Sequence, residues 1–252
     1  MRTFGRSIAI ALALLVWVGA AQGAVKPGKP NKPSKPIAAA KPKAQMISDM
    51  FLVQEDLRWG YIDKTGKVVM SGYEETGDFS DGLAHVTLDG RCGFIDPKGK
   101  MVVPVQYDGA GRFSEGLAPV RVGKVWGYVD RTGNIVIQPK YAKASEFSEG
   151  LAVVEIDGKC GAIDKTGAVV IQPIYLDMAR PSEGLIAVIK DGKWGFIDRT
   201  EAVVIAPQFT RTDHFSCGLA PAQLGNKWGF IDKSGGWVVQ PKHDGAQPFS
   251  EG

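Results

Sequence analysis

The sequence predicts an all-β protein built from six tandem repeats of about 34 residues, each folding as a three-stranded antiparallel meander. A dipeptide ending in glycine returns every 33 or 34 residues, and a mostly phenylalanine position returns every 34 residues. The dipeptides are Trp59-Gly60, Cys92-Gly93, Trp126-Gly127, Cys160-Gly161, Trp194-Gly195 and Trp228-Gly229. The second series is Phe79, Phe113, Phe147, Pro181, Phe215 and Phe249. Because both series keep one period, they indicate a true internal repeat.

Residues 148–181 show how one unit is expected to fold. Its β-rich runs predict three strands, at 151–156, 159–164 and 168–172. Asp157-Gly158 joins the first two, and it suits a two-residue hairpin because both central positions of that turn need a positive φ. The second turn, 164–167, has Asp first and Gly fourth. Pro173 is expected to end the third strand because it cannot donate a hydrogen bond to a neighbour.

The repeat explains the glycine content of 32 in 252 residues, which is nearly twice the usual fraction of ~7%. Most units need glycine at two turns, before Leu-Ala and after the tryptophan. A glycine after tryptophan lets a neighbouring backbone or ring approach closely. In the fifth unit Glu201 takes the turn position that Gly167 holds in the fourth. We therefore expect Glu201 to adopt a positive φ with local strain, or the turn to be reshaped.

The strand faces predict how the units pack. In the run 194–198, Trp194 and Phe196 point to one side of the strand while Gly195 and Ile197 point to the other. The third strand, Val203-Val204-Ile205, is apolar on both sides. A sheet with one wet face would alternate apolar and polar residues, so each sheet is expected to be covered on both faces by its neighbours. An open β-repeat stack is slightly favoured, and a β-propeller-like ring is the alternative.

Residues 1–23 have the pattern of a signal peptide. Arg2 and Arg6 precede the apolar run 8–21, which is shorter than the ~20 residues of a membrane-spanning helix. Small residues, among them Ala21 and Gly23, precede the expected cleavage site. The chain is thus expected to be exported, periplasmic or secreted, with no transmembrane span after cleavage. An uncleaved membrane anchor is the alternative.

Residues 24–45 alternate lysine with proline and predict a disordered linker. It could serve as a solvated spacer or as a cationic tether to anionic envelope polymers. Residues 1–45 hold eight basic residues and no acid, so the remainder is mildly acidic, which argues against nucleic acid as the main partner. The repeat domain is expected to span 46–252. Because residues 249–252 repeat the start of a unit, either further repeats follow or the last strand is truncated.

The recurring residues resemble the WG-repeat family, also called WG-containing β repeats. The segments closest to the family pattern are WGYID at 59–63, WGYVD at 126–130 and WGFID at 194–198 and 228–232, while Cys92 and Cys160 depart from it. The resemblance covers residues 46–252 and implies a bacterial, repeat-built β protein. It implies no catalytic residue, because the family has no established common chemistry.

The chemistry-bearing residues predict neither an enzyme nor a metal or cofactor site. One aspartate per unit precedes a turn glycine by three positions, where it is expected to cap its own turn rather than bind calcium. These residues are Asp63, Asp96, Asp130, Asp164, Asp198 and Asp232. The acids of the recurring Ser-Glu-Gly segments, such as Glu115 and Glu149, are expected to form a solvated rim or an acidic stripe for a cationic partner. For Cys217, near His214, an exposed and reactive thiol is the alternative to a structural one.

The fourth unit has small residues at positions that are large elsewhere, namely Cys160, Ala162 and Pro181. Such changes leave either a collapsed seam or a cavity. The sequence therefore predicts a ligand pocket near Cys160, Ala162, Tyr175 and Pro181. The expected function is a non-catalytic binding or scaffold protein of the bacterial envelope that recognises a protein or a cell-wall polymer. A hydrolase with an inter-repeat active site and a structural spacer are the alternatives.

Overall fold

The computed structural model describes residues 50–249. The chain divides into two units, Met1–Ala44 and Gln45–Gly252, and the described residues belong to the second. The predicted signal peptide at 1–23 and linker at 24–45 lie outside the described residues and stay predictions. Within residues 50–249 every regular element is a strand, so this part contains no helix that could span a membrane.

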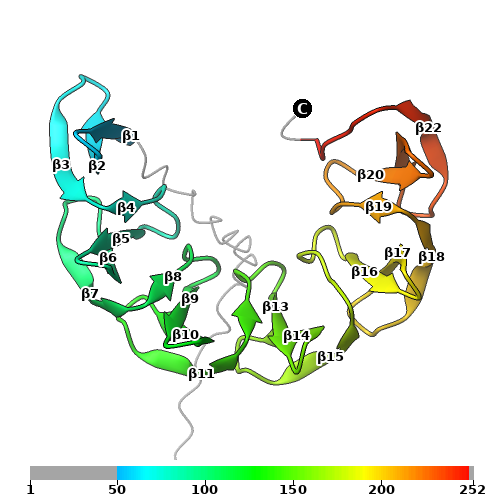
Figure 1. Cartoon of the computed structure of the whole chain (residues 1–252), viewed down its shortest axis with the longest axis horizontal. Coiled ribbons are helices and arrows are strands. Elements are labelled where there is room, and N and C mark those ends of the chain that lie inside the picture. The colour runs from blue at the N-terminus through cyan, green and yellow to red at the C-terminus, as the bar shows by residue number, and fades with distance from the viewer. Residues whose placement is uncertain (1–49, 250–252) are drawn as a thin grey trace, which may run out of the picture. The chain divides into compact units, whose positions relative to one another are not determined.

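The strands form six antiparallel sheets, one for each repeat (Figure 1). The first sheet holds β1 (Met50–Glu55), β2 (Arg58–Asp63) and β3 (Val68–Tyr73), and the second β4 (Glu75–Thr76), β5 (Ala84–Leu88), β6 (Arg91–Ile95) and β7 (Met101–Tyr107). The third holds β8 (Gly109–Ala110), β9 (Leu117–Val122), β10 (Val125–Asp130) and β11 (Ile135–Tyr141), and the fourth β12 (Lys143–Ala144), β13 (Leu151–Ile156), β14 (Lys159–Asp164) and β15 (Val169–Tyr175). The fifth holds β16 (Ile186–Lys190), β17 (Lys193–Ile197) and β18 (Val203–Phe209), and the sixth β19 (Arg211–Thr212), β20 (Leu219–Leu224), β21 (Lys227–Asp232) and β22 (Trp237–His243).

The meander of three strands is present in every unit, and four sheets add a two-residue strand that the sequence did not reveal. These added strands are β4, β8, β12 and β19, each paired with the strand that follows it. They lie in the segment predicted to be a connection between units. A pair of residues is too short to show an alternating pattern, which is why the sequence gives no sign of it.

The third strand does not stop at its proline as expected, since β15 runs through Pro173 to Tyr175. The register of β14 against β15 shifts between Cys160 and Ala162, so the ladder is interrupted beside this proline. β15 is also the edge strand of its sheet. An edge or bulge position tolerates proline because no hydrogen bond is needed from its nitrogen.

The glycine after each tryptophan or cysteine allows a close backbone approach, as predicted. A Cβ on Gly161 would lie 2.6 Å from the carbonyl oxygen of Ile171 and 2.8 Å from the nitrogen of Pro173. A Cβ on Gly195 would lie 2.6 Å from the carbonyl oxygen of Ile205. The third strand of each sheet therefore folds tightly over this glycine.

The recurring aspartates cap their turns, which confirms that prediction. The Oδ1 atom of Asp164 accepts hydrogen bonds from the backbone nitrogens of Thr166, at 2.8 Å, and Ala168, at 3.1 Å. Asp63, Asp96, Asp130, Asp198 and Asp232 repeat this arrangement. The hydrogen bond from the Thr166 hydroxyl, above all, lowers the pKa of Asp164 below its usual value.

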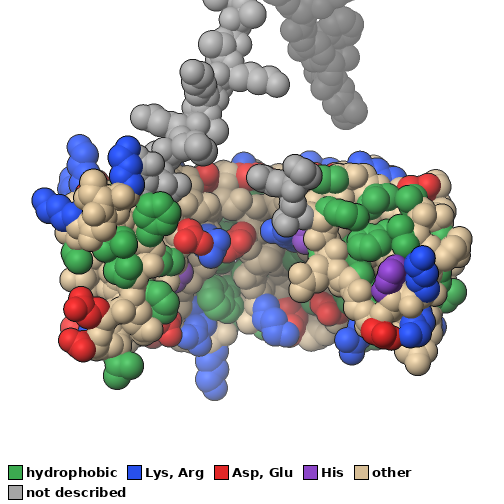
Figure 2. Space-filling model, turned by 90° about the horizontal axis from the view of Figure 1, so that it is seen from above, with side chains coloured by type: hydrophobic (Ala, Val, Ile, Leu, Met, Phe, Trp, Pro, Cys, Tyr) green, Lys and Arg blue, Asp and Glu red, His purple; other side chains and the backbone are tan. Residues whose placement is uncertain are grey.

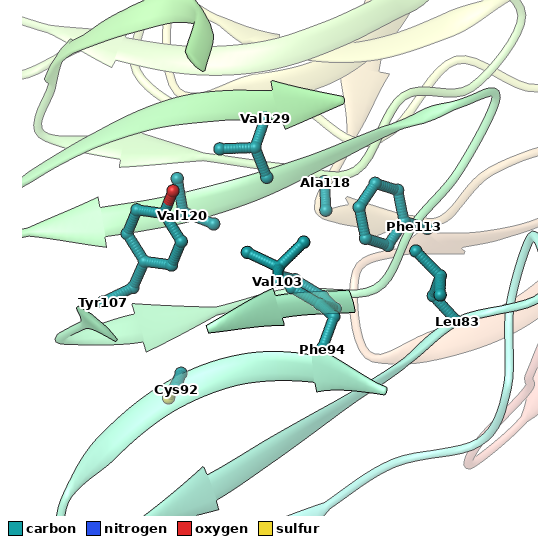
Figure 3. Close-up of a cluster of buried hydrophobic side chains, with 9 residues drawn as sticks. All are labelled: Leu83, Cys92, Phe94, Val103, Tyr107, Phe113, Ala118, Val120 and Val129. Carbon is teal, nitrogen blue, oxygen red and sulfur yellow. The ribbon is translucent and has the colours of Figure 1, made fainter. Parts of the chain in front are cut away.

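Each hydrophobic cluster joins two consecutive sheets, so the units do cover one another. The cluster in Figure 3 combines side chains of the second sheet, such as Phe94, with side chains that precede or belong to the third, such as Phe113 and Val120. The rings of Phe94 and Phe113 lie 4.7 Å apart. The first phenylalanine of a unit generally packs in this way on an aromatic ring of the preceding unit.

The outer strands correct the expectation that both faces of every strand are covered. Val203 and Val204 of β18 keep exposed fractions of 54% and 43%. Figure 1 shows the reason: the third strands run along the outside of the curved row of sheets, and the short strands lie on its inside. Prolines on these outer strands, as at 173 and 207, oppose pairing with another chain.

The six sheets follow one another along an open curve, with the first and last sheets at its two ends (Figure 1). Each sheet is set like the blade of a propeller, but the row does not close. The arrangement thus has open ends, as in the favoured stack, and radially set sheets, as in the propeller-like alternative.

Candidate functional site

The acids of the Ser-Glu-Gly segments lie largely at the exposed surface, as a solvated rim would, and they also bind the neighbouring unit. The carboxylate of Glu149 accepts hydrogen bonds from the backbone nitrogens of Glu183, at 2.6 Å, and Gly184, at 2.9 Å. Asp81, Glu115 and Glu183 make the same contact with the next unit's glycine. We call this series the acid ladder, and it occupies these carboxylates within the fold.

The cysteines and histidines do not assemble a nucleophilic or metal centre among the described residues. Cys92 is buried, Cys160 half-buried and Cys217 exposed, and all three are free thiols. Over residues 50–249 no group of three His, Cys, Asp or Glu side chains converges as metal ligands would. The ring nitrogens of His214 lie 2.7 Å from Asp213 Oδ1 and 3.0 Å from Arg180 Nη2, so they are engaged away from Cys217.

A cavity of about 280 Å³ opens beside Cys160, between the fourth and fifth sheets. Its wall includes Lys143, Val153, Glu155, Cys160, Asp177, Met178 and Arg180. Of the four residues predicted for this pocket, Cys160 lines it. Ala162, Tyr175 and Pro181 are buried, and Ala162 and Tyr175 lie in the hydrophobic cluster beneath the cavity, together with Ile171. The space left by Ala162 has therefore collapsed, whereas the space left by Cys160 has remained open.

A second cavity, of about 470 Å³, lies beside Cys92 between the second and third sheets. Its wall includes Glu74, Glu75, His85, Thr87, Cys92, Asp108, Arg121 and Trp126. Figure 3 shows Cys92 at the margin of the buried cluster, apart from Phe113 and Leu83. The sequence did not single out this cavity, although the cysteine that replaces tryptophan at 92 was a visible signal for it.

The two cavities occupy equivalent places in the repeat. Cys92 pairs with Tyr107 across the sheet, and Cys160 pairs with Tyr175. The same position is tryptophan in the other four units, as at Trp59 and Trp194, which pack against the clusters of their junctions. Large-to-small replacement in a packed junction leaves a void unless the neighbours collapse. We therefore attribute both cavities to the exchange of tryptophan for cysteine.

The cavity at Cys160 has an apolar floor with charges at its rim. Lys143 Nζ lies 2.7 Å from Glu155 Oε2. Burial raises the pKa of the Cys160 thiol, and the nearby carboxylates of Asp177 and Glu155 act in the same direction. Cys160 is therefore protonated at neutral pH and is poorly suited to act as a nucleophile, which requires a thiolate.

The cavity at Cys92 is the more polar of the two. Glu74 is paired with Arg58 at 3.3 Å and accepts a hydrogen bond from the backbone nitrogen of Gly90. Asp108 pairs in the same way with Arg91, at 2.5 Å, and with the nitrogen of Gly123. Those two carboxylates thus stabilise the hairpin turns at Gly90 and Gly123. Burial lowers the pKa of His85, so its ring is neutral at pH 7.

The surface in Figure 2 carries acidic and basic side chains interspersed with apolar ones. It shows no broad area of a single charge. On this face, recognition of a partner would depend on local pockets more than on a long-range electrostatic field.

The solved structures that resemble this chain share its fold at low sequence identity. Kluyveromyces lactis Hsv2p is 13% identical, with 73% of this chain and 71% of that chain covered and a TM-score of 0.49. KlHsv2 with loop 6CD replaced by a Gly-Ser linker is 11% identical, with 79% and 80% covered and a TM-score of 0.50. A eukaryotic initiation factor is 11% identical, with 76% and 62% covered and a TM-score of 0.52.

The loop-replaced KlHsv2 is propeller-like, and its likeness to this chain agrees with the blade-like setting of the sheets. The chain matches no curated protein by sequence. The family model for the WG containing repeat matches six consecutive segments, 59–92, 93–126, 126–160, 161–194, 194–228 and 228–252. Each match begins at the recurring dipeptide, within the second strand of a meander, and the six matches confirm the resemblance noted in the recurring motifs. The chain therefore belongs to the WG containing repeat family.

Proposed function

We propose that this chain is a non-catalytic binding protein of the bacterial cell envelope that holds a protein or a cell-wall polymer at the cavities beside Cys92 and Cys160. The observation that carries the proposal is their equivalence: the same replacement opens both cavities at the same position, two repeats apart. Two like-placed sites on one rigid scaffold favour a partner with repeated or extended features, because two weak contacts reinforce each other.

A binding role suits the chemistry of both cavities better than turnover. The thiol at Cys160 is held protonated, and two of the three carboxylates at the Cys92 cavity, those of Glu74 and Asp108, are engaged by arginines and backbone nitrogens. Groups that are already satisfied position a ligand or hold a loop, whereas a general acid or base must be free to exchange its proton.

The envelope location is supported by the sequence alone. A basic start, a short apolar run and small residues before position 24 are typical of exported chains. The alternating lysines and prolines at 24–45 would hold the repeat domain away from an anchor or wall. N-terminal sequencing of the protein recovered from the periplasm or medium of an expressing bacterium tests this point, and a start near Ala24 is expected.

The binding proposal is tested by retention of the full chain on purified peptidoglycan and on immobilised envelope membrane proteins. Cys92→Trp and Cys160→Trp restore the residue found at four equivalent positions, so both variants should fold while filling their cavities. We expect saturable retention of the unchanged protein and loss of retention in the double variant. Cys217→Ser, which changes an exposed thiol elsewhere, is the matched control and should bind normally.

The outcomes separate the alternatives. Retention that survives filling both cavities would place the binding surface elsewhere. No retention by any envelope fraction would favour a structural spacer. Release of labelled wall fragments, lost in a single-residue variant, would favour a hydrolase.

A further inference from the structure

The cavity beside Cys92 contains two buried polar atoms without a partner. The Nε atom of Arg121 and the Nδ1 atom of His85 are both shielded from solvent, and neither has a hydrogen-bond partner among the described residues. Both residues line the same cavity. Buried polar groups are almost always satisfied, so Arg121 and His85 are candidates to bind a polar ligand at this cavity.

Arg121 carries a charge that the described residues do not balance. Its Nη2 atom donates to the backbone carbonyl oxygen of Asp108 at 2.5 Å, and its guanidinium lies 5.8 Å from the centre of the Trp126 ring. The carboxylate of Asp108 is turned instead to Arg91 and Gly123. A half-buried guanidinium that contacts only a carbonyl and an aromatic ring can still donate two hydrogen bonds to the carboxylate of a ligand.

Both residues are exceptions at their positions in the repeat. The residue facing the tryptophan or cysteine across the first hairpin is Arg121 in the third unit, and Gln54, Thr87, Glu155, Ile189 and Gln223 in the others. The position of His85 is held by Pro119, Val153, Ala187 and Pro221 in the other units from the third to the sixth. The fold therefore requires neither side chain.

The neighbouring residues make room for these groups. A Cβ on Gly109 would lie 3.0 Å from Arg121 Nε and 3.4 Å from the Trp126 ring, so the missing side chain at 109 leaves the guanidinium space. Glu75, also on the cavity wall, is exposed and has no ion pair among the described residues. The cavity thus offers one unpaired cation and, at its rim, one unpaired anion.

We infer that the cavity beside Cys92 binds an amino acid or a short peptide through its free carboxylate, with Arg121 as the anchor and Glu75 facing the amino group. The inference rests on the proposed binding function and names the ligand chemistry of one of its two sites. A volume of about 470 Å³ falls in the usual range for small ligands. His85, whose ring is neutral, lies on the wall of the same cavity.

Isothermal titration of the full chain with the dipeptide Ala-Ala and with its C-terminal amide tests the inference. Ala-Ala is expected to bind, and the amide to bind at least about tenfold more weakly, because the amide lacks the charge that pairs with Arg121. Arg121→Gln introduces the residue that Gln54 and Gln223 supply at the equivalent position. It should weaken the binding of Ala-Ala to the affinity of the amide and leave the affinity of the amide unchanged. Cys92→Trp should abolish binding of both, and Cys217→Ser, at an exposed thiol away from the cavity, should change neither.

A measurement on the free protein separates a ligand anchor from a structural arginine. If Arg121 waits for a ligand, Arg121→Gln should leave the urea midpoint of the ligand-free chain unchanged or raised, and should remove its stabilisation by Ala-Ala. A clear fall in the midpoint, equal binding of the dipeptide and its amide, or no binding at millimolar concentration would overturn the inference. Those results would leave the retention test of the cavity-filling variants unaffected, so the proposed function could fail or stand separately.

Discussion

At the scale of single residues, Glu201 shows how the repeat accommodates a departure from its own pattern. It has a φ of 66° at a turn position where other units have glycine, which confirms the expected strained conformation. The glycines at this position lie against the preceding unit, since a Cβ on Gly167 would be 3.2 Å from the side chain of Ile137. Glu201 instead extends its carboxylate to the backbone nitrogen of Gln172, at 2.9 Å. A strained turn is thus offset by a hydrogen bond between units.

Substitutions at 201 should separate the strain from the hydrogen bond. Glu201→Ala loses the bond and keeps the strain, whereas Glu201→Gly loses the bond and removes the strain. Relative to the unchanged protein, we expect the free energy of unfolding of the alanine variant to be lower by about 1 kcal/mol. That of the glycine variant should lie within about 0.5 kcal/mol of the unchanged value. Urea denaturation gives both values. A glycine variant less stable than the alanine variant would show that the turn is not strained.

At the scale of the structural element, the acid ladder connects one hairpin to the next. In each Ser-Glu-Gly-Leu segment the acid and the glycine both have positive φ, as in Glu149 at 53° and Gly150 at 77°. The serine and leucine close the turn with two backbone hydrogen bonds, for example between Ser148 and Leu151. Glutamate is an unfavourable residue for this conformation, and its bond to the next unit explains how the fold tolerates it.

The ladder gives the protein a specific dependence on pH. The hydrogen bond from Lys233, and then the bond from the Gly218 nitrogen, hold the pKa of Glu183 below its usual value. A carboxyl whose pKa is lowered in the folded state stabilises the fold at pH values above the pKa of glutamate in the unfolded chain, about 4.3. That stabilisation is lost as pH falls through the folded value.

We expect Glu183→Gln to lower the free energy of unfolding by about 1 kcal/mol at pH 7 and to have little effect near pH 3. Glutamine keeps an acceptor oxygen and removes the charge, so the pH dependence reports the charge. Urea titrations at pH 7, 5 and 3 provide the measurement. Glu55→Gln, at an exposed strand end, serves as the control. A difference that persists unchanged at pH 3 would contradict the role of the carboxylate.

The same scale shows what the sequence could predict. Three strands per unit, the Asp-Gly hairpin and the turn aspartates follow from local rules, because each depends on residues within a few positions of one another. The acid ladder could not be predicted in this way, since Glu149 meets Gly184 across a distance of 35 residues. Likewise β15 continues past Pro173 because of its edge position, and a strand's place in a sheet is a tertiary property.

At the scale of the whole molecule, the cavities illustrate the same division. Cysteine in place of tryptophan was visible at both 92 and 160, but only packing decides which small residues leave an open space. Ala162 is covered by Ile171 and its neighbours, while Cys160 keeps a cavity. The two unpartnered atoms at Arg121 and His85 have no counterpart in a sequence pattern. They arise where the third unit packs against the second.

The open row of sheets also implies a gradient of local stability. Within residues 50–249 the four inner sheets are held on both sides by hydrophobic clusters, whereas the first and sixth sheets have one such neighbour. Apolar residues remain exposed at the two ends, including Phe51 and Val238 at 56% each. In a linear repeat each unit depends on its nearest neighbours, so the end units should open before the middle ones.

Native-state hydrogen exchange followed by mass spectrometry measures this gradient. We expect the central strands β9 to β14 to exchange at least about tenfold more slowly than β1 to β3 and β20 to β22, which corresponds to a difference of about 1.4 kcal/mol in opening free energy. Ala152→Gly in β13, a fully buried junction position, should reduce protection on both sides of its junction and much less in the first sheet. Equal protection of all six sheets would mean that the ends are joined in solution, as they would be in a closed ring.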